Sequence, residues 1–159
     1  MKNSNYLILV IEDEEEVRTS IVHLLRSVGF RVVEARDGKE GMASMREHDV
    51  RLVVTDILMP EMDGLEVVME VRKFYPGTKI VAISKGLEFL TLASTLGAHA
   101  TIAKPFQAAD LLDTIRRTDV EEQSCEPGAL YAKPPAPPLA RITQPAPWST
   151  LFAIHRQFV

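Results

Sequence analysis

The sequence predicts an α/β fold, a doubly wound parallel sheet of five strands with helices on both faces. Two observations predict it. Strand-like and helix-like segments alternate up to about residue 117, as expected of repeated β–α units. Four of the strand-like runs end on a charged or hydroxyl residue. Such residues would meet at the carboxyl edge of a parallel sheet, where open α/β folds bind their ligands.

The expected strands are short runs rich in Val, Ile and Leu. They cover residues 6–11, 31–35, 52–56, 79–83 and 101–103. Nearly continuous apolar runs of this kind suit parallel strands, which are buried on both faces. Right-handed crossovers leave few strand orders, and the common five-stranded order is 2-1-3-4-5. In that order the first and third strands are neighbours.

The expected helices follow the strands and carry apolar residues at helical spacing. These positions run from Val17 to Val28, Met42 to Met45, Leu65 to Phe74, Leu87 to Leu96 and Leu111 to Ile115. Gly29 and Gly97 suit helix ends, and Pro76-Gly77 stops the third helix. The acidic run 14–16 suits the positive end of a helix dipole.

Composition restricts the function classes. A net charge of −4 gives no basic surface for direct nucleic-acid binding. No apolar run approaches the length of a membrane span, and the first residues do not form a signal peptide. The only cysteine, Cys125, cannot form an internal disulfide. We therefore expect a cytoplasmic protein in a reducing compartment.

Beyond residue 118 the composition changes, and seven of the ten prolines lie there. We expect residues 118–159 to be a Pro-rich, flexible tail after a single domain over 5–117. Bulky residues at i, i+3, i+4 and i+7 from Trp148 predict a short amphipathic helix over 148–158. In isolation such a helix is marginally stable. Three alternatives remain open for this segment. It could dock on its own domain, pair with another copy of the chain, or have no role.

The residues at the strand ends suggest phosphoryl chemistry. Glu12 and Asp13 follow the first strand, and Asp56 ends the third. Close carboxylates repel one another, and a hard cation that prefers oxygen ligands, Mg²⁺, relieves the repulsion. Asp56 can act as a nucleophile on phosphorus, as in aspartyl-phosphate intermediates. Lys104 and the hydroxyl of Ser84 suit the charge on a phosphoryl group. Glu34, Asp37 and Glu40 are interpreted as solvated side chains.

Over residues 5–117 the chain resembles the receiver domain of bacterial response regulators. The resemblance rests on Glu12-Asp13-Glu14, on Asp56-Ile57-Leu58-Met59-Pro60-Glu61-Met62-Asp63-Gly64, on Ser84 and on Lys104-Pro105-Phe106. These motifs occur in the family's order and at family-like spacing. The resemblance implies a flavodoxin-like (βα)5 fold and a two-component phosphorelay protein.

It also implies residue roles. Asp56 accepts a phosphoryl group from a phosphohistidine of a histidine kinase or a histidine phosphotransfer protein. Glu12, Asp13, Asp56 and the backbone carbonyl of Leu58 bind Mg²⁺. Ser84 and Lys104 contact the phosphoryl group, and Ser84 moves towards it on activation. The Lys104–Pro105 peptide is expected to be cis.

Two positions depart from the family pattern. Thr101 lies three residues before Lys104, where the family usually has the aromatic residue that completes its switch. Lys85 follows Ser84 directly, where a small residue is common. We expect Thr101 to change how the signal is relayed, and Lys85 to change the lifetime of the aspartyl phosphate.

Several functions therefore stay open. The leading hypothesis is a signalling module that catalyses its own phosphotransfer and slow hydrolysis and acts through a downstream protein target, with homodimerisation possible. A degenerate receiver acting as a constitutive scaffold and a truncated DNA-binding response regulator are the alternatives. A phosphatase is disfavoured, because Leu58 stands where a second aspartate is expected.

Overall fold

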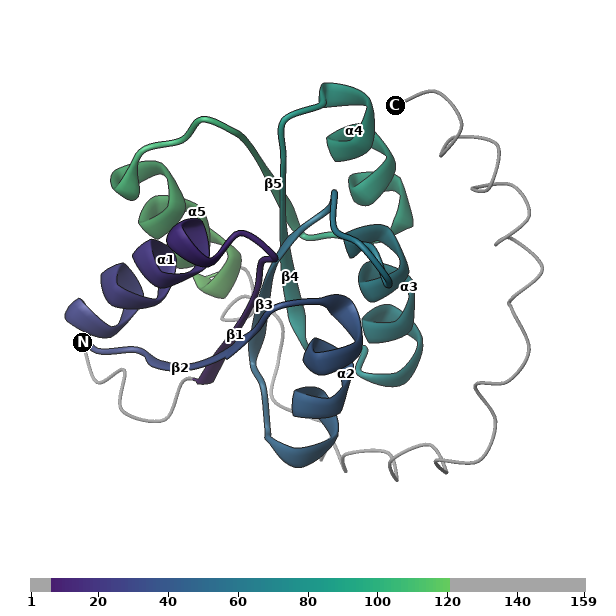
Figure 1. The fold of residues 1–159 in the computed structure, drawn as a ribbon, viewed down its shortest axis with the longest axis horizontal. Helices are drawn as coiled ribbons and strands as arrows, with labels where there is room; N and C mark the ends of the chain where they lie inside the picture. The colour runs from purple at the N-terminus through teal and green to yellow at the C-terminus, as the bar shows by residue number, and fades with distance from the viewer. Residues whose placement is uncertain (1–6, 121–159) are drawn as a thin grey trace.

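The computed structural model describes residues 7–120. Residues 1–6 and 121–159 lie outside the described part, and with them the predicted helix over 148–158. Strands and helices alternate along the described chain (Figure 1). In order they are β1 (Leu7–Ile11), α1 (Glu15–Ser27), β2 (Arg31–Ala35), α2 (Gly38–Glu47), β3 (Leu52–Asp56), α3 (Gly64–Phe74), β4 (Lys79–Ser84), α4 (Leu87–Leu96), β5 (Ala100–Ala103) and α5 (Ala108–Val120).

The sheet confirms the predicted topology. All strand pairs are parallel, and the order is β2-β1-β3-β4-β5. The register brings the strand ends level, since Ile11 of β1 lies opposite Thr55 of β3 and Asp56 lies opposite Ile83 of β4. The residues that follow β1, β3 and β4 therefore emerge at one edge of the sheet.

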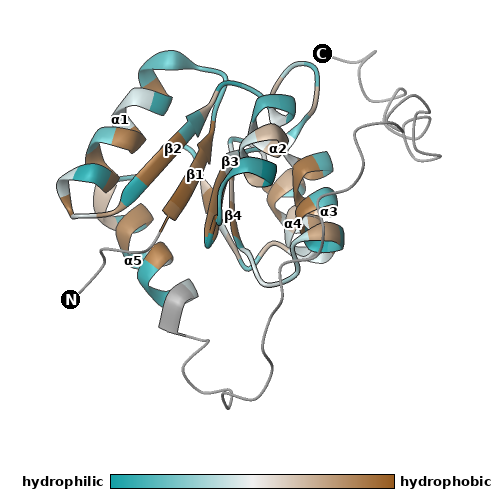
Figure 2. Cartoon of the chain, turned by 90° about the horizontal axis from the view of Figure 1, so that it is seen from below, coloured by the Kyte–Doolittle hydropathy of each residue, from teal (hydrophilic) through white to brown (hydrophobic). Residues whose placement is uncertain are grey.

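Helices cover both faces of the sheet. Helices α1 and α5 lie side by side on one face, and α2, α3 and α4 cover the other (Figures 1 and 2). Alternate residues of β1 divide between two cores: Leu9 packs in the cluster beneath α2–α4, and Val10 packs in the cluster beneath α1 and α5. Figure 2 shows the apolar strands between helices that are apolar on one side.

Local signals set several helix ends. The Asp63 side chain accepts a hydrogen bond from the Glu66 N–H at 2.9 Å, and the Glu66 carboxylate accepts from the Asp63 N–H, which completes a capping box at the start of α3. Gly97 ends α4 with a φ of 107°, in the left-handed region that favours glycine. Helix α5 continues to Val120, beyond the end at 117 expected for the domain.

The three acids expected to be solvated all take part in specific contacts, and Glu40 accepts a hydrogen bond from the Arg36 N–H at 2.9 Å. The Asp37 side chain caps α2 by accepting a hydrogen bond from the Glu40 N–H at 2.8 Å. Glu34 on β2 forms ion pairs with Arg18 and Arg26 of α1, at 3.5 and 3.8 Å. Glu34 is exposed, as expected, but its ion pairs form only because folding brings α1 beside β2, whereas the cap made by Asp37 is a local contact at the start of its own helix.

Among residues 7–120, no helix is long and apolar enough to cross a membrane.

Candidate functional site

Three acidic side chains meet at the carboxyl edge of the sheet. Glu12 follows β1 directly, Asp13 comes next, and Asp56 is the last residue of β3. One oxygen of each carboxylate lies within 4.8 Å of the others. Glu12 and Asp56 are buried, and Asp13 is exposed. The convergence expected from the strand order is thus present, because β1 and β3 are hydrogen-bonded neighbours.

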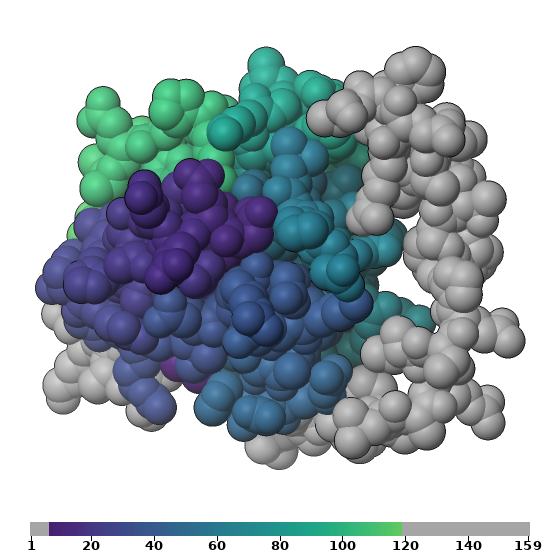
Figure 3. Space-filling view, in the orientation of Figure 1, coloured from purple at the N-terminus to yellow at the C-terminus, as the bar shows by residue number. Residues whose placement is uncertain are grey.

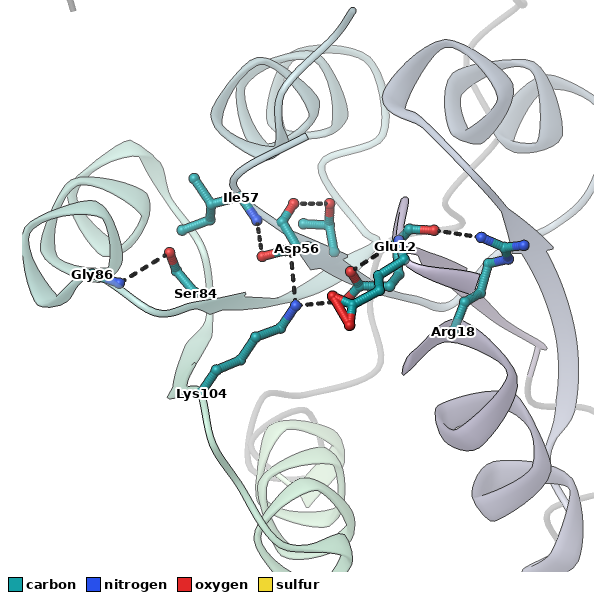
Figure 4. A network of polar contacts seen from close by, with 9 residues as sticks. Glu12, Arg18, Asp56, Ile57, Ser84, Gly86 and Lys104 are labelled. Carbon is teal, nitrogen blue, oxygen red and sulfur yellow. Dashed lines mark hydrogen bonds and ion pairs between the residues drawn. The ribbon is translucent and has the colours of Figure 1, made fainter. Parts of the chain in front are cut away.

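Lys104 joins two of these acids (Figure 4). Its Nζ donates hydrogen bonds to Glu12 Oε2 and to Asp56 Oδ2, both at 2.8 Å. The side chains of Lys104, Glu12 and Asp56 are only 10%, 2% and 9% exposed. One ammonium group therefore contacts two buried carboxylates, and the exposed carboxylate of Asp13 beside them leaves an excess of negative charge at the site.

Burial and pairing have opposite effects on the titration of this cluster. Burial raises the pKa of Glu12 above its ordinary value, although the hydrogen bond from Lys104 opposes that shift. Burial by itself lowers the pKa of Lys104, but its hydrogen bonds to Asp56 and Glu12 outweigh burial and raise the pKa. Lys104 is therefore held in its charged form.

The backbone around Asp56 is fixed closely. The Ile57 N–H donates to Asp56 Oδ1 at 2.8 Å, and the Thr55 hydroxyl donates to the Asp56 carbonyl oxygen at 2.8 Å. Gly64 at the start of α3 packs against this point, since a Cβ built there would lie 2.0 Å from the Asp56 carbonyl oxygen. The helix approaches the strand end so closely that only glycine fits.

The other predicted residues lie around the cluster. Ser84 ends β4 and is buried, and its Oγ accepts a long hydrogen bond of 3.4 Å from the Gly86 N–H (Figure 4). Leu58 lies in the loop after Asp56 with its side chain 49% exposed. Thr101 on β5 is partly buried and lies opposite Ala82. The Lys104–Pro105 peptide is cis, as expected.

Arg18 is a contributor that the sequence analysis missed. Its Nη1 donates to the Glu12 carbonyl oxygen at 2.8 Å (Figure 4), and its Nε lies 3.5 Å from Glu34 Oε2. This contact ties α1 to the loop that presents Glu12 and Asp13. No local pattern signals these contacts, because the Glu12 carbonyl oxygen and Glu34 belong to the loop before α1 and to the strand after it.

The donor set suits one class of ligand. Three carboxylates at one point are the oxygen ligands that a hard divalent cation prefers. A cation there would stand beside the Asp56 carboxylate, with the Ser84 hydroxyl at the end of the neighbouring strand β4 and the Lys104 ammonium group directly after β5.

Comparisons with known proteins agree with this arrangement. Residues 8–116 match the family model of the response regulator receiver domain. The chemotaxis protein CheY of Bacillus subtilis is 36% identical over 114 residues, which cover 70% of this chain and 95% of CheY. The sensor kinase CckA of Brucella abortus is 38% identical over 114 residues, 69% of this chain but only 12% of that kinase. The chain thus spans nearly all of one relative and a small part of the other.

Solved structures give the same result. The receiver domain protein (CheY-like) of Methanospirillum hungatei has a TM-score of 0.70 and 29% identity, covering 76% of this chain and 98% of that one. The response regulator TrrA of Thermotoga maritima, solved in complex with Mg²⁺–BeF, has a TM-score of 0.67 and 28% identity, covering 71% and 98%.

Proposed function

The chain belongs to the response regulator receiver domain family of two-component systems, and on this premise we propose that Asp56 is its phosphoryl acceptor. The observation that carries the proposal is the environment of the Asp56 carboxylate. It lies at a strand end, hydrogen-bonded to Lys104 Nζ at 2.8 Å and clustered with Glu12 and Asp13.

In the proposed reaction an Asp56 carboxylate oxygen attacks the phosphorus of a phosphohistidine. The new O–P bond forms as the P–N bond breaks, and the electron pair of that bond returns to the imidazole nitrogen. A water molecule later attacks phosphorus, which releases inorganic phosphate and restores the carboxylate. An ionised carboxylate needs no general base for the first step.

We propose Mg²⁺ as the cation of the site, held by Glu12, Asp13, Asp56 and the backbone carbonyl of Leu58. The closeness of three carboxylate oxygens supports a hard cation. When bound, Mg²⁺ supplies positive charge that offsets the charge of the phosphoryl oxygens. The complex of TrrA with Mg²⁺–BeF is consistent with this assignment.

Lys104 and Ser84 are proposed to contact the transferred group. Lys104 already carries a positive charge against Asp56, so it can move from the carboxylate to a phosphoryl oxygen without a change of protonation. The only hydrogen bond recorded for Ser84 Oγ in the described residues is the long one from Gly86, which is weak. Its hydroxyl proton is thus available to a phosphoryl oxygen.

The proposed partners are a histidine kinase or a histidine phosphotransfer protein as donor and a downstream protein as target. Thr101 replaces the aromatic residue that usually completes the family's switch. We therefore expect the signal of phosphorylation to be relayed through Ser84 and the neighbouring helix α4. A constitutive scaffold would use the same surfaces without phosphorylation.

Labelling with a small phosphodonor tests the proposal. The protein is incubated with radiolabelled acetyl phosphate, with Mg²⁺ or with EDTA. We expect labelling only with Mg²⁺, and its loss in Asp56→Asn. Asp63→Asn is the matched control, because asparagine also caps helices well and Asp63 lies outside the cluster. Labelling of Asp56→Asn at the wild-type level would exclude Asp56 as the acceptor.

A further inference from the structure

A largely apolar groove lies between α1 and the start of α5. Val17, Ile21 and Leu24 of α1 line one side of the groove, and Phe106 and Leu111 line the other. The volume of the groove is about 810 Å³. The two helices lie side by side in Figures 1 and 3, where α1 is purple to blue and α5 is green. Grooves of this size and character commonly hold a ligand or an amphipathic helix.

Charged residues mark the rim of this groove. Glu14 and Glu16 lie on the α1 side, and Lys85 and Lys104 lie at the end next to the carboxylate cluster. Glu14, Glu16 and Lys85 are exposed. The α1 rim is acidic, so it favours an occupant with a positive charge beside its apolar face.

One segment of this chain has those properties. Residues 148–158 contain Trp148, Leu151, Phe152 and His155 at i, i+3, i+4 and i+7, the spacing of one helix face. The segment contains Arg156 and no acidic residue. In a helix, Arg156 would lie at the flank of the apolar face, where it could meet the acidic rim.

We propose that residues 148–158 dock as an amphipathic helix in the groove between α1 and α5 of the same chain. A helix this short gains its stability from packing, so docking and helix formation would occur together. The groove shares Lys104 with the carboxylate cluster, but the docking itself does not depend on phosphorylation of Asp56.

The intervening chain is long enough for the docking. Helix α5 has 13 residues and is therefore about 20 Å long, and the groove lies at its amino-terminal end. Residues 121–147 separate Val120 from Trp148, and a random chain of that length has a root-mean-square span of about 30 Å. Tethering at this length gives effective concentrations on the order of millimolar, so even weak affinity fills the groove.

Fluorescence of Trp148, the only tryptophan in the chain, tests the docking in the intact protein. We expect the emission of the folded chain to be blue-shifted relative to the urea-unfolded chain and to be protected from acrylamide. L151D/F152D, in the segment, and Leu24→Asp, in the groove, should each abolish the shift and the protection. Circular dichroism checks that both variants remain folded.

Leu87→Asp is the matched control, because Leu87 is 70% exposed and does not line the groove. It should leave the emission unchanged. The proposal is overturned if Trp148 in the wild type emits as in the unfolded chain, or if Leu24→Asp has no more effect than Leu87→Asp. A shift that grows with protein concentration, together with a dimer mass in sedimentation, would also overturn it in favour of a second copy.

Discussion

Lys104 is the residue on which the balance of charge at the site depends. Its ammonium group contacts two carboxylates that are almost fully buried. Breaking a buried ion pair by removing one partner leaves an uncompensated charge and costs about 3–5 kcal/mol. Lys104 therefore has a structural role in the resting protein in addition to its proposed role in phosphoryl transfer.

We predict that Lys104→Met lowers the free energy of unfolding by about 3 kcal/mol in EDTA, and that Mg²⁺ restores part of the loss. Urea denaturation followed by circular dichroism measures both values. Lys85→Met is the control, since Lys85 is exposed and its replacement should change stability by less than about 0.5 kcal/mol. Equal effects of the two substitutions would show that the contacts of Lys104 contribute no special stability.

Tyr75 is a second residue with a testable titration. Its side chain is buried at 7% exposure, and its hydroxyl is the single buried side-chain polar atom without a hydrogen-bond partner in the described range 7–120. Burial raises the pKa of Tyr75 above its ordinary value of about 10. The folded protein therefore keeps the phenol proton at pH values where the unfolded chain loses it.

From this shift we predict that wild-type stability falls as pH rises above about 10, and that Tyr75→Phe falls less steeply. The stabilising contribution of Lys104 is also lost at alkaline pH because its pKa is raised, but that loss is common to both proteins. At pH 7 the substitution should be neutral or stabilising by about 1 kcal/mol, because it removes an unpaired buried hydroxyl. Urea melts across pH 7 to 11 measure this. Parallel pH profiles would contradict it.

At the scale of elements, the junction of β3 and α3 determines where Asp56 lies. Gly64 brings the helix onto the strand end, and the Asp63–Glu66 capping box fixes where the helix begins. A methyl group at residue 64 would meet backbone atoms of Asp56 and Ile57, which cannot move independently of the site.

Gly64→Ala should therefore destabilise the protein by about 2 kcal/mol and weaken Mg²⁺ binding, as overpacking at a rigid contact does. Gly86→Ala is the matched control, since the atoms nearest to a Cβ there belong to the side chains of Phe89 and Glu88 and not to backbone. Its effect on stability should stay below about 0.5 kcal/mol. Thermal melts with and without Mg²⁺ measure both. Unchanged Mg²⁺ binding in Gly64→Ala would contradict the role given to this junction.

The elements themselves could be predicted from the sequence, because continuous apolar runs and helical spacing are local signals. The meeting of Glu12, Asp13 and Asp56 followed from strand order, since parallel strands end at one edge. The contacts of Arg18 with Glu12 and of Asp37 with Glu40 were not predicted. The Arg18 contact depends on side-chain directions that are set only when α1 packs against the sheet, whereas the Asp37 cap is a local contact between residues three apart.

At the scale of the whole molecule, cation binding should be linked to folding. A ligand that binds only the folded state stabilises it by RT ln(1 + [L]/Kd), about 2.7 kcal/mol at a hundred times Kd. The three acids come from separate parts of the chain, so the unfolded chain does not form the site.

We therefore predict that Mg²⁺ raises the midpoint of thermal unfolding of the wild type in a concentration-dependent way, and that Asp13→Asn loses most of this increase. Asp13 is exposed, so its substitution should not damage the fold. Asp49→Asn, at another exposed acid outside the cluster, is the control. An equal response of all three proteins to Mg²⁺ would place the cation elsewhere.

The most direct measurement is the location and chemistry of the phosphoryl group in the wild-type protein. After incubation with acetyl phosphate and Mg²⁺, the protein is digested and the modified peptide is identified by mass spectrometry. We predict a single phosphoryl group on the peptide that contains Asp56, removed by hydroxylamine as expected of an acyl phosphate and absent when EDTA replaces Mg²⁺. A phosphoryl group on another peptide, or one resistant to hydroxylamine, would contradict the assignment of Asp56.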